Sequence, residues 1–209
     1  MEKVFYVVSN YNNPLDWLKE YTDDYLIYDR SDTDEFIKGL KAIKVPNIGW
    51  DIYDKLTYLI DHYDELPDII LLIKGNLFKH ISKEEFDQVK DTKTFTPLLT
   101  KNHRTYEPVC RYKDGIYEEI NNRWYLPKFR TDKLKDYDAF WDWIEPGYQQ
   151  EAYKRFAPGS NYIVTRQDVL KHPKAFYEKL RSFIDYCQLP GECQILERDL
   201  YHIWHEFPS

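Results

Sequence analysis

Cysteine, methionine and long apolar runs are scarce in this sequence, and each absence narrows what the protein can be. The 209 residues contain three cysteines and one methionine. An odd and small number of cysteines does not suit a disulfide scaffold and indicates a reducing compartment. No apolar run approaches the roughly 18 residues of a membrane span, and the N-terminal apolar segment is too short for the core of a secretion signal. We therefore expect a cytoplasmic protein without a membrane span.

Basic residues are also fewer than acidic residues. Lys and Arg number 29 against 36 Asp and Glu, so the formal net charge is −7. A general nucleic-acid binder needs a basic face that replaces the counterions of the phosphate backbone, so we expect no nucleic-acid partner. A small basic pocket for a phosphate-bearing molecule stays compatible with this charge.

The glycine motifs of common nucleotide-binding loops are also missing. The chain has only seven glycines, and neither G-x-G-x-x-G nor G-x-x-x-x-G-K-[ST] occurs. The Rossmann dinucleotide fingerprint and the P-loop are therefore excluded.

Short β-branched or aromatic runs alternate with helical patterns in the first half of the chain. The run at 68–73 is apolar throughout, as in strands that are covered on both faces. Apolar residues recur at helical spacing over 51–63. We expect strands at 3–9, 25–28 and 68–73 and helices at 16–21, 34–42 and 51–63. This order predicts an α/β fold with parallel strand pairing.

The second half of the chain reads less regularly. Ser82 and Glu85 have the spacing of a capping box at the start of a helix. We expect helices at 82–89, 167–187 with a break at Pro173, and 197–205, and strands near 106–112, 117–120 and 162–164. No internal repeat or linker occurs, so we expect a single domain over residues 1–209.

Polar side chains follow the predicted strands where each one ends. Ser9 and Asn10 close the first strand, Asp29 and Arg30 close the second, and a loop from Lys74 to His80 follows the central one. Because ligands bind beyond the carboxyl ends of parallel strands, these residues are candidates for a phosphate or nucleoside site. The alternatives are a polar turn, a surface ion pair and a charged loop.

Two carboxylates and an aromatic cluster in the second half are candidates for chemistry on a sugar. Glu192 follows a Pro-Gly turn, and Glu197 is expected to open the last helix. Either can act as a general base, or can pair with a neighbouring cation on a helix face. Tyr137, Trp141 and Trp143 can stack on sugar rings or belong to the core.

Four blocks together carry a family resemblance over most of the chain. They are VVSNYN, YDRSD, VPNIGWDIYDKLTYLIDHYDELPDIILLIKGNLFKH, and FAPGSNYIVTRQDVLKHPKAFYEKL with ECQILERDLYHIW. The chain resembles the nucleotide-sugar-dependent glycosyltransferases of the GT-A fold. More closely, it resembles the small glycosyltransferase domain of large algal (chlorella-type) viruses and related bacterial and fungal domains of uncertain function.

The resemblance implies a single GT-A-like, Rossmann-like domain with a mixed, mostly parallel central sheet flanked by helices. Residues 1–90 would form a nucleotide-sugar-binding half and residues 91–209 an acceptor-binding half, either as a whole protein or as part of a longer polypeptide. A viral member would work in the host cytoplasm. The residues implied to bind the donor are Val8, Ser9, Asn10, Asp29, Arg30, Asn47, Gly49, Asp51, Lys74 and Asn76.

The sequence departs from the resembled family at its metal-binding motif. An acidic D-x-D motif, which binds a divalent Mn²⁺ or Mg²⁺ bridging the diphosphate, is expected after the central strand. Here the position reads Lys74-Gly75-Asn76. Two possibilities stay open: Asn76 and His80 hold a metal, or Lys74 takes over the neutralisation of charge.

The resemblance implies the transfer of a hexose or deoxyhexose from a nucleoside-diphosphate donor, with UDP as the expected nucleotide, to a glycan or glycoprotein acceptor in glycoprotein biosynthesis. We expect Glu197 as the catalytic base, with Glu192 as the second choice. The alternatives are a nucleotide- or sugar-binding module without catalysis and a structural interaction domain.

Overall fold

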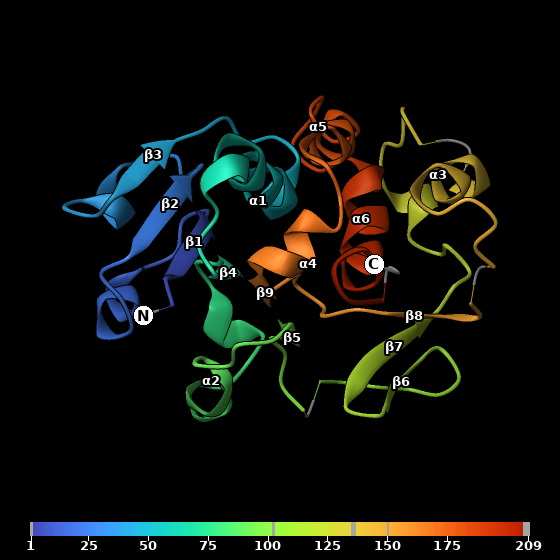
Figure 1. Cartoon of the computed structure of the whole chain (residues 1–209), viewed down its shortest axis with the longest axis horizontal. Helices are drawn as coiled ribbons and strands as arrows, with labels where there is room; N and C mark the ends of the chain where they lie inside the picture. The colour runs from blue at the N-terminus through green and yellow to red at the C-terminus, as the bar shows by residue number, and fades with distance from the viewer. Residues whose placement is uncertain (1, 102, 135–136, 150, 207–209) are drawn as a thin grey trace.

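A six-stranded mixed sheet forms the centre of the molecule (Figure 1). The computed structural model describes every residue except 1, 102, 135–136, 150 and 207–209. The strand order is β3-β2-β1-β4-β9-β5, and β1 to β4 are parallel to one another, whereas β9 runs antiparallel to both of its neighbours. The strands are β1 (Val4–Asn10), β2 (Tyr25–Asp29), β3 (Ala42–Lys44), β4 (Ile69–Lys74), β5 (Thr96–Pro97) and β9 (Tyr162–Thr165).

Helices cover both faces of this sheet. On one face, Val7 and Leu72 pack in a core with residues of α1 (Trp50–Asp61), α5 (Lys174–Ser182) and α6 (Gly191–Tyr201). On the other face, Val8 and Leu71 pack against the short helix η1 (Asp16–Glu20) and α2 (Lys83–Val89). Because successive strand residues point to opposite faces, burial on both sides explains why β4 is apolar along its whole length.

A second, antiparallel sheet lies beside the first and is built from β6 (Cys110–Lys113), β7 (Ile116–Ile120) and β8 (Tyr153–Arg155). α3 (Tyr137–Ile144) lies above this sheet in Figure 1. The remaining helical segments are short: α4 (Arg166–Leu170), η2 (Glu35–Ile37), η3 (Tyr63–Glu65), η4 (Leu77–Lys79), η5 (Leu126–Lys128) and η6 (His202–Glu206). Among the described residues, no helix has the length and hydrophobicity that crossing a membrane requires.

Most of the expected elements are confirmed, including the α/β class and the mixed, mostly parallel sheet. The capping box is confirmed too, since the Ser82 hydroxyl accepts a hydrogen bond from the Glu85 N–H and the Glu85 carboxylate accepts one from the Ser82 N–H. The expected halves of the chain interleave, because β9 and β5 come from beyond residue 90 and complete the sheet that β1 to β4 begin. The fold is therefore a single Rossmann-like domain.

Two predicted helices are wrong in extent. Residues 34–42 form only the single turn η2, since Gly39 follows in a left-handed conformation and Ala42 already belongs to β3. The last helix does not begin at Glu197. It begins at Gly191, because Pro190 has an extended conformation suited to the residue before a helix. Glu197 therefore lies in the middle of α6, and Glu192 lies in its first turn.

Because β4 lies at the centre of the core, we expect substitutions in it to lower the stability of the fold. Leu72 is fully buried, so Leu72→Ala removes apolar contacts on a sheet that cannot collapse around the gap. We expect a loss of about 2–5 kcal/mol in the free energy of unfolding, measured by urea denaturation. Leu170, which is 48% exposed, provides the control, and Leu170→Ala should stay within about 0.5 kcal/mol. Equal effects of the two substitutions would contradict the central placement of β4.

Candidate functional site

The sheet has a topological switch point beside β1. The chain passes from β1 to β2 and β3 on one side, and β4 then pairs with β1 on the other side. Connections leave the sheet in opposite directions at such a point, and the carboxyl ends of the strands open into a crevice that serves as a ligand site. A cavity of about 220 Å³ lies there. Its lining consists of Ser9, Asn10, Tyr11, Asn13, Arg30, Trp50, Asp51, Lys74, Asn76 and His80.

The structure brings together most of the residues expected to bind a donor. Six of them line this cavity: Ser9, Asn10, Arg30, Asp51, Lys74 and Asn76. Asn47 lines an adjoining cavity of about 90 Å³, which shares Tyr11, Arg30 and Trp50 with the first. Residues from β1, β2, β4 and the start of α1 therefore converge as their positions at the strand ends predicted.

Val8, Asp29 and Gly49 support the site without belonging to the lining. Val8 is fully buried in the core, because alternation along β1 turns its side chain into the layer beneath the sheet. Asp29 is buried and accepts hydrogen bonds from Asn10 Nδ2 at 2.9 Å and from Ser31 and Lys44, so it holds the Asn10 amide in place. Neither Val8 nor Asp29, both expected to bind the donor, is among the described residues that line the cavity.

Gly49 sets the position of the helix that follows it. Its φ of 60° lies in the left-handed region, and a Cβ there would come within 2.6 Å of the Ile184 carbonyl oxygen. Its N–H donates to the Cys187 carbonyl at 2.9 Å. Glycine at this position lets the start of α1 lie directly on the segment that follows α5.

Trp50 is a lining residue that the sequence analysis missed. It is not glycine, yet its φ is 50°, a conformation that costs a non-glycine residue free energy. Its side chain is 36% exposed, lies between the two cavities, and has the Lys74 ammonium 4.4 Å from its ring. Strained residues cluster at ligand sites, and a large aromatic residue directly after a glycine at a helix start was the available signal.

Two lysines share the carboxylate of Asp51. Asp51 Oδ2 lies 2.6 Å from Lys55 Nζ and accepts from the Ser160 hydroxyl, while Oδ1 lies 3.2 Å from Lys74 Nζ. Burial alone raises the pKa of the Asp51 carboxyl, but the charges of Lys55 and Lys74 outweigh it and hold this pKa well below its usual value. Burial lowers the pKa of Lys55, against the opposing effect of Asp51.

A second ion pair lies next to the first. Arg30 Nη2 lies 2.5 Å from Asp54 Oδ2, and the Ser9 hydroxyl donates to the same oxygen. Burial raises the pKa of Asp54 to about 6, with Arg30 and Ser9 acting in the opposite direction. Arg30 Nη1 donates to the Ile48 carbonyl at 3.2 Å, while Arg30 Nε is buried and has no hydrogen-bond partner among the described residues.

The two ion-paired groups around Asp51 and Asp54 contain three cations and two carboxylates, so they carry one excess positive charge. Among the ion pairs of the described residues, Arg30, Lys55 and Lys74 contact Asp51 and Asp54, and Asp29 is paired with Lys44; Glu197 acts on Lys55 without an ion-pair contact. An anion entering the cavity therefore meets one more positive than negative charge within a buried setting, where such interactions are strong.

His80 forms one wall of the cavity and packs directly on Gly159. A Cβ at Gly159 would overlap the His80 ring, so only glycine allows this contact. Burial, followed by the charge of Lys74, lowers the pKa of His80 to about 4. The imidazole is therefore neutral at pH 7.

The residues predicted to hold a metal do not form a suitable ligand set. Asn76 and His80 line the same cavity, but they offer one amide and one imidazole beside the Lys74 ammonium. Mg²⁺ and Mn²⁺ prefer several oxygen ligands, carboxylates above all. In the part of the chain that the structure describes, no group of three or more His, Cys, Asp and Glu residues is arranged to hold a metal ion.

The two glutamates expected as catalytic bases are held by other groups. Glu192 is fully buried, and its carboxylate accepts from the Lys133 N–H at 2.6 Å, the Leu134 N–H at 3.1 Å and the Tyr186 hydroxyl at 2.6 Å. Glu192 therefore fastens the segment before α3 to the start of α6. The expectation that Glu197 opens the last helix is wrong, since it lies in the middle of α6.

Glu197 supports the loop that carries Gly159. Its Oε1 accepts from the Gly159 N–H at 2.8 Å, and its Oε2 lies 3.6 Å from Arg198 Nη1. Gly159 in turn packs on His80. Glu197 is therefore connected to the cavity through the Gly159 loop, and neither it nor Glu192 is among the described residues that line the cavity.

Of the aromatic cluster in α3, Trp141 belongs to the core, whereas Trp143 is exposed. Trp141 is buried and stacks on Tyr148 with ring centroids 4.7 Å apart. The Trp143 ring stacks on Phe176 at 5.2 Å. The side chain of Tyr137, the third residue expected to stack on sugars, lies outside the described residues.

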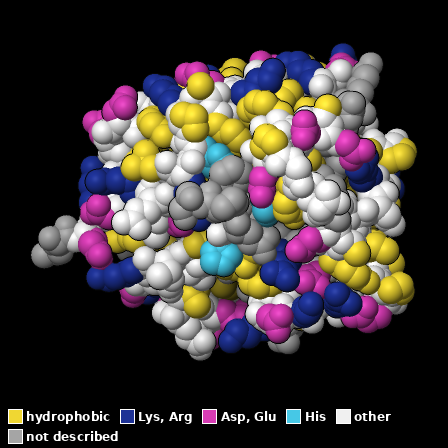
Figure 2. Space-filling view, turned by 45° about the vertical axis from the view of Figure 1, so that its right-hand side comes forward, with side chains coloured by type: hydrophobic (Ala, Val, Ile, Leu, Met, Phe, Trp, Pro, Cys, Tyr) yellow, Lys and Arg dark blue, Asp and Glu magenta, His cyan; other side chains and the backbone are white. Residues whose placement is uncertain are grey.

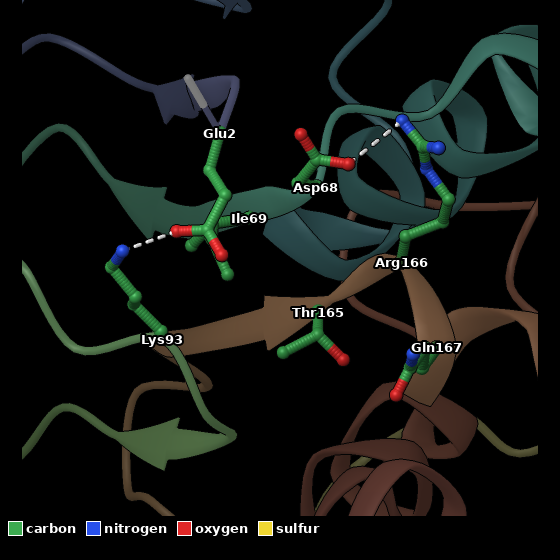
Figure 3. Close-up of a pocket in the computed structure, with 7 residues that line it drawn as sticks. All are labelled: Glu2, Asp68, Ile69, Lys93, Thr165, Arg166 and Gln167. Atoms are coloured by element: carbon green, nitrogen blue, oxygen red, sulfur yellow. Dashed lines mark ion pairs between the residues drawn. The ribbon is translucent and has the colours of Figure 1, made fainter.

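Another cavity, of about 490 Å³, lies at the opposite end of β4 (Figure 3). Two ion pairs flank it, Glu2 with Lys93 at 2.5 Å and Asp68 with Arg166 at 3.2 Å. The four charged residues labelled in Figure 3 balance one another within these two pairs. This cavity also lies at the amino ends of the parallel strands. The smaller cavity at the carboxyl ends, with its positive excess, is therefore the stronger candidate.

Figure 2 shows one face of the molecule, and on its described part the charged side chains of both signs are mixed. Lys and Arg side chains there lie among Asp and Glu side chains, so neither sign forms a continuous field on the part of that face that the structure describes.

Residues 6–207 match the model of a family described as protein of unknown function (DUF3431). No curated protein and no solved structure matches the chain.

The contacts of Glu192 predict a structural role that stability measurements can check. Glu192→Gln replaces one acceptor oxygen by an NH₂ group that faces donors, so we expect a loss of about 1–3 kcal/mol in the free energy of unfolding. Glu178→Gln, on the exposed side of α5, is the control and should change it by less than about 0.5 kcal/mol. An unchanged stability of Glu192→Gln would show that these hydrogen bonds do not hold the start of α6.

The low pKa of His80 predicts a pH dependence. The unfolded chain binds a proton at His80 below about pH 6.5, whereas the folded chain does so only near pH 4, so the free energy of unfolding falls as the pH drops through this window. In the wild type, this loss should exceed that of His80→Gln by about 1–2 kcal/mol, after allowance for solvent screening of a partly buried ring. Urea titrations at pH 7 and pH 4.5 measure the difference, and parallel pH profiles would contradict it.

Proposed function

The chain belongs to the family described as protein of unknown function (DUF3431), and we propose that this member is a glycosyltransferase that binds a nucleoside-diphosphate sugar at the cavity between the ends of β1 and β4. The donor nucleotide is UDP, and the sugar passes to a glycan or glycoprotein acceptor. The proposed place of this activity is the cytoplasm.

One observation supports this proposal above the others: the cavity at the switch point has a positive excess formed by Arg30 and Lys74 together with Lys55. A diphosphate is the anion that suits such a place, since it carries charge on several oxygens and lies between two organic groups. The strand order and the resemblance of the strand-end segments to nucleotide-sugar glycosyltransferases agree with this choice.

The two adjoining cavities match the two parts of a nucleotide. The smaller one is bordered by the aromatic side chains of Tyr11 and Trp50 and by Leu189, which suits a planar base. The larger one is bordered by Lys74, Asn76 and His80, which suits the diphosphate and the sugar. Arg30 borders both and can contact the group that connects them.

Transfer breaks the bond between the anomeric carbon and the diphosphate oxygen, and the electron pair stays on that oxygen. The acceptor hydroxyl oxygen forms the new bond to the anomeric carbon and gives up its proton, which the leaving diphosphate oxygen can take. Positive groups fixed beside the leaving group stabilise the charge as it develops. Glu192 and Glu197 are both engaged by other groups, which favours such an arrangement over direct displacement with either of them as the base.

The same engagement of Glu192 and Glu197 favours a second candidate function, a nucleotide-binding module without catalysis. Incubation with a UDP-sugar separates the two candidates. Slow release of free sugar, detected by chromatography, is expected of a glycosyltransferase and excludes a module that only binds.

Trp50 provides a direct test of the nucleotide site. Trp50→Gly removes the ring that borders both cavities but relieves the left-handed backbone, so we expect stability to change little. UDP binding should weaken by about 1–3 kcal/mol, the usual contribution of a base stacked on an aromatic ring, in calorimetric titrations. Trp124→Ala, an exposed tryptophan outside the cavity, should leave UDP affinity unchanged. Equal UDP affinity in wild type and Trp50→Gly would remove this site from the proposal.

A further inference from the structure

We infer that the ammonium of Lys74 takes the position of the divalent cation at the diphosphate, so that this protein binds nucleoside diphosphates without a metal. This inference rests on the proposed function and concerns the same cavity. It follows from the contacts of three groups: Lys74 itself, the carboxylate of Asp51, and the other polar side chains of the lining.

Lys74 is fixed at the end of β4 by contacts on several sides. Its backbone N–H donates to Asn161 Oδ1 at 2.8 Å, and the next residue, Gly75, donates from its N–H to the Ser9 carbonyl at 2.8 Å. Its ammonium lies 3.2 Å from Asp51 Oδ1 and 4.4 Å from the Trp50 ring. A cation held in this way loses little conformational entropy when a ligand binds, as a preorganised site requires.

Asp51 is the carboxylate that lines the cavity, and its oxygens are already engaged. Lys55 and the Ser160 hydroxyl contact Oδ2, and Lys74 contacts Oδ1. A divalent cation would have to displace these groups to gain Asp51 as a ligand. Because Lys55 is completely buried, losing its carboxylate would leave an uncompensated charge in the interior. Asp51 therefore serves the lysines and is not available to a metal.

The pairing with Lys55 also determines what Lys74 offers to a ligand. One carboxylate faces two ammonium groups, so the charge of Asp51 is already offset by the buried Lys55. An ammonium group has three N–H donors, and that of Lys74 contacts one carboxylate oxygen, Asp51 Oδ1, at 3.2 Å. Lys74 therefore presents uncompensated positive charge and N–H donors to the cavity, as a metal ion presents charge to phosphate oxygens.

Apart from Arg30, which is paired with Asp54, the other polar groups of the lining are neutral. Ser9 donates its hydroxyl to Asp54, Asn76 offers an amide, and His80 has a neutral ring at pH 7. A divalent cation among them would be repelled by Lys74 without a carboxylate to offset the repulsion. Phosphate oxygens are attracted to Lys74 and can accept hydrogen bonds from the amide.

Calorimetry with UDP as the probe tests this inference on the intact chain. Wild-type protein is titrated in EDTA, in Mn²⁺ and in Mg²⁺, and we expect the three dissociation constants to agree within about twofold. Lys74→Ala and Lys74→Met, the second of which keeps the apolar stem, should each weaken UDP binding by about tenfold or more in EDTA. Lys79→Ala, an exposed lysine in the same loop, should match the wild type.

The outcomes separate the inference from the proposed function. UDP binding that is tenfold tighter with Mn²⁺ or Mg²⁺ than in EDTA overturns the role of Lys74 and leaves the glycosyltransferase proposal intact. Metal-independent binding that both Lys74 variants retain also overturns that role. No UDP binding in any of the three buffers overturns the nucleotide site and the inference with it. The wild-type comparison needs no variant, so it decides the metal question even where a substitution prevents folding.

Discussion

The carboxylate of Asp51 is the interaction on which the rest of the site depends. It joins the first turn of α1 to Lys74 at the end of β4 and to Ser160 in the loop before β9, and it neutralises the buried Lys55. Removing one partner of such a cluster leaves a buried charge without compensation, at a cost of several kcal/mol. The positions of one helix, one strand and one loop around the cavity are therefore fixed together by a single charged group.

The general location of the site could be predicted from sequence because it follows from strand direction. Parallel strands place their carboxyl ends at one edge, so Ser9, Asn10, Arg30, Lys74 and Asn76 came together once the strands were identified. The strands themselves were recognisable because burial on both faces of β4 demands an unbroken apolar run. Local patterns thus predicted the sheet, the first long helix and the edge at which polar residues meet.

These local patterns do not predict contacts between segments that are distant in the sequence. Ser160 meets Asp51 across 109 positions of sequence, and the strain at Trp50 depends on how the preceding loop lies on the segment after α5. The hydrogen bonds of Glu192 and Glu197 were not predictable because a carboxylate near an expected helix start looks the same in sequence whether it faces solvent or holds a loop. Their hydrogen bonds to Leu134 and Gly159 depend on tertiary packing, which periodicity does not describe.

The antiparallel pairing of β9 with β4 has a consequence for how the protein is made on the ribosome. The strands β1 to β4 emerge first, but the free edge of β4 stays without its neighbour until residues 162–165 have been synthesised. An apolar strand with an unpaired edge is a template for association with other chains. During biosynthesis the edge of β4 is therefore open to association with other chains, and Ser160, which contacts Asp51 beside the candidate cavity, is added only after most of these 209 residues have been translated.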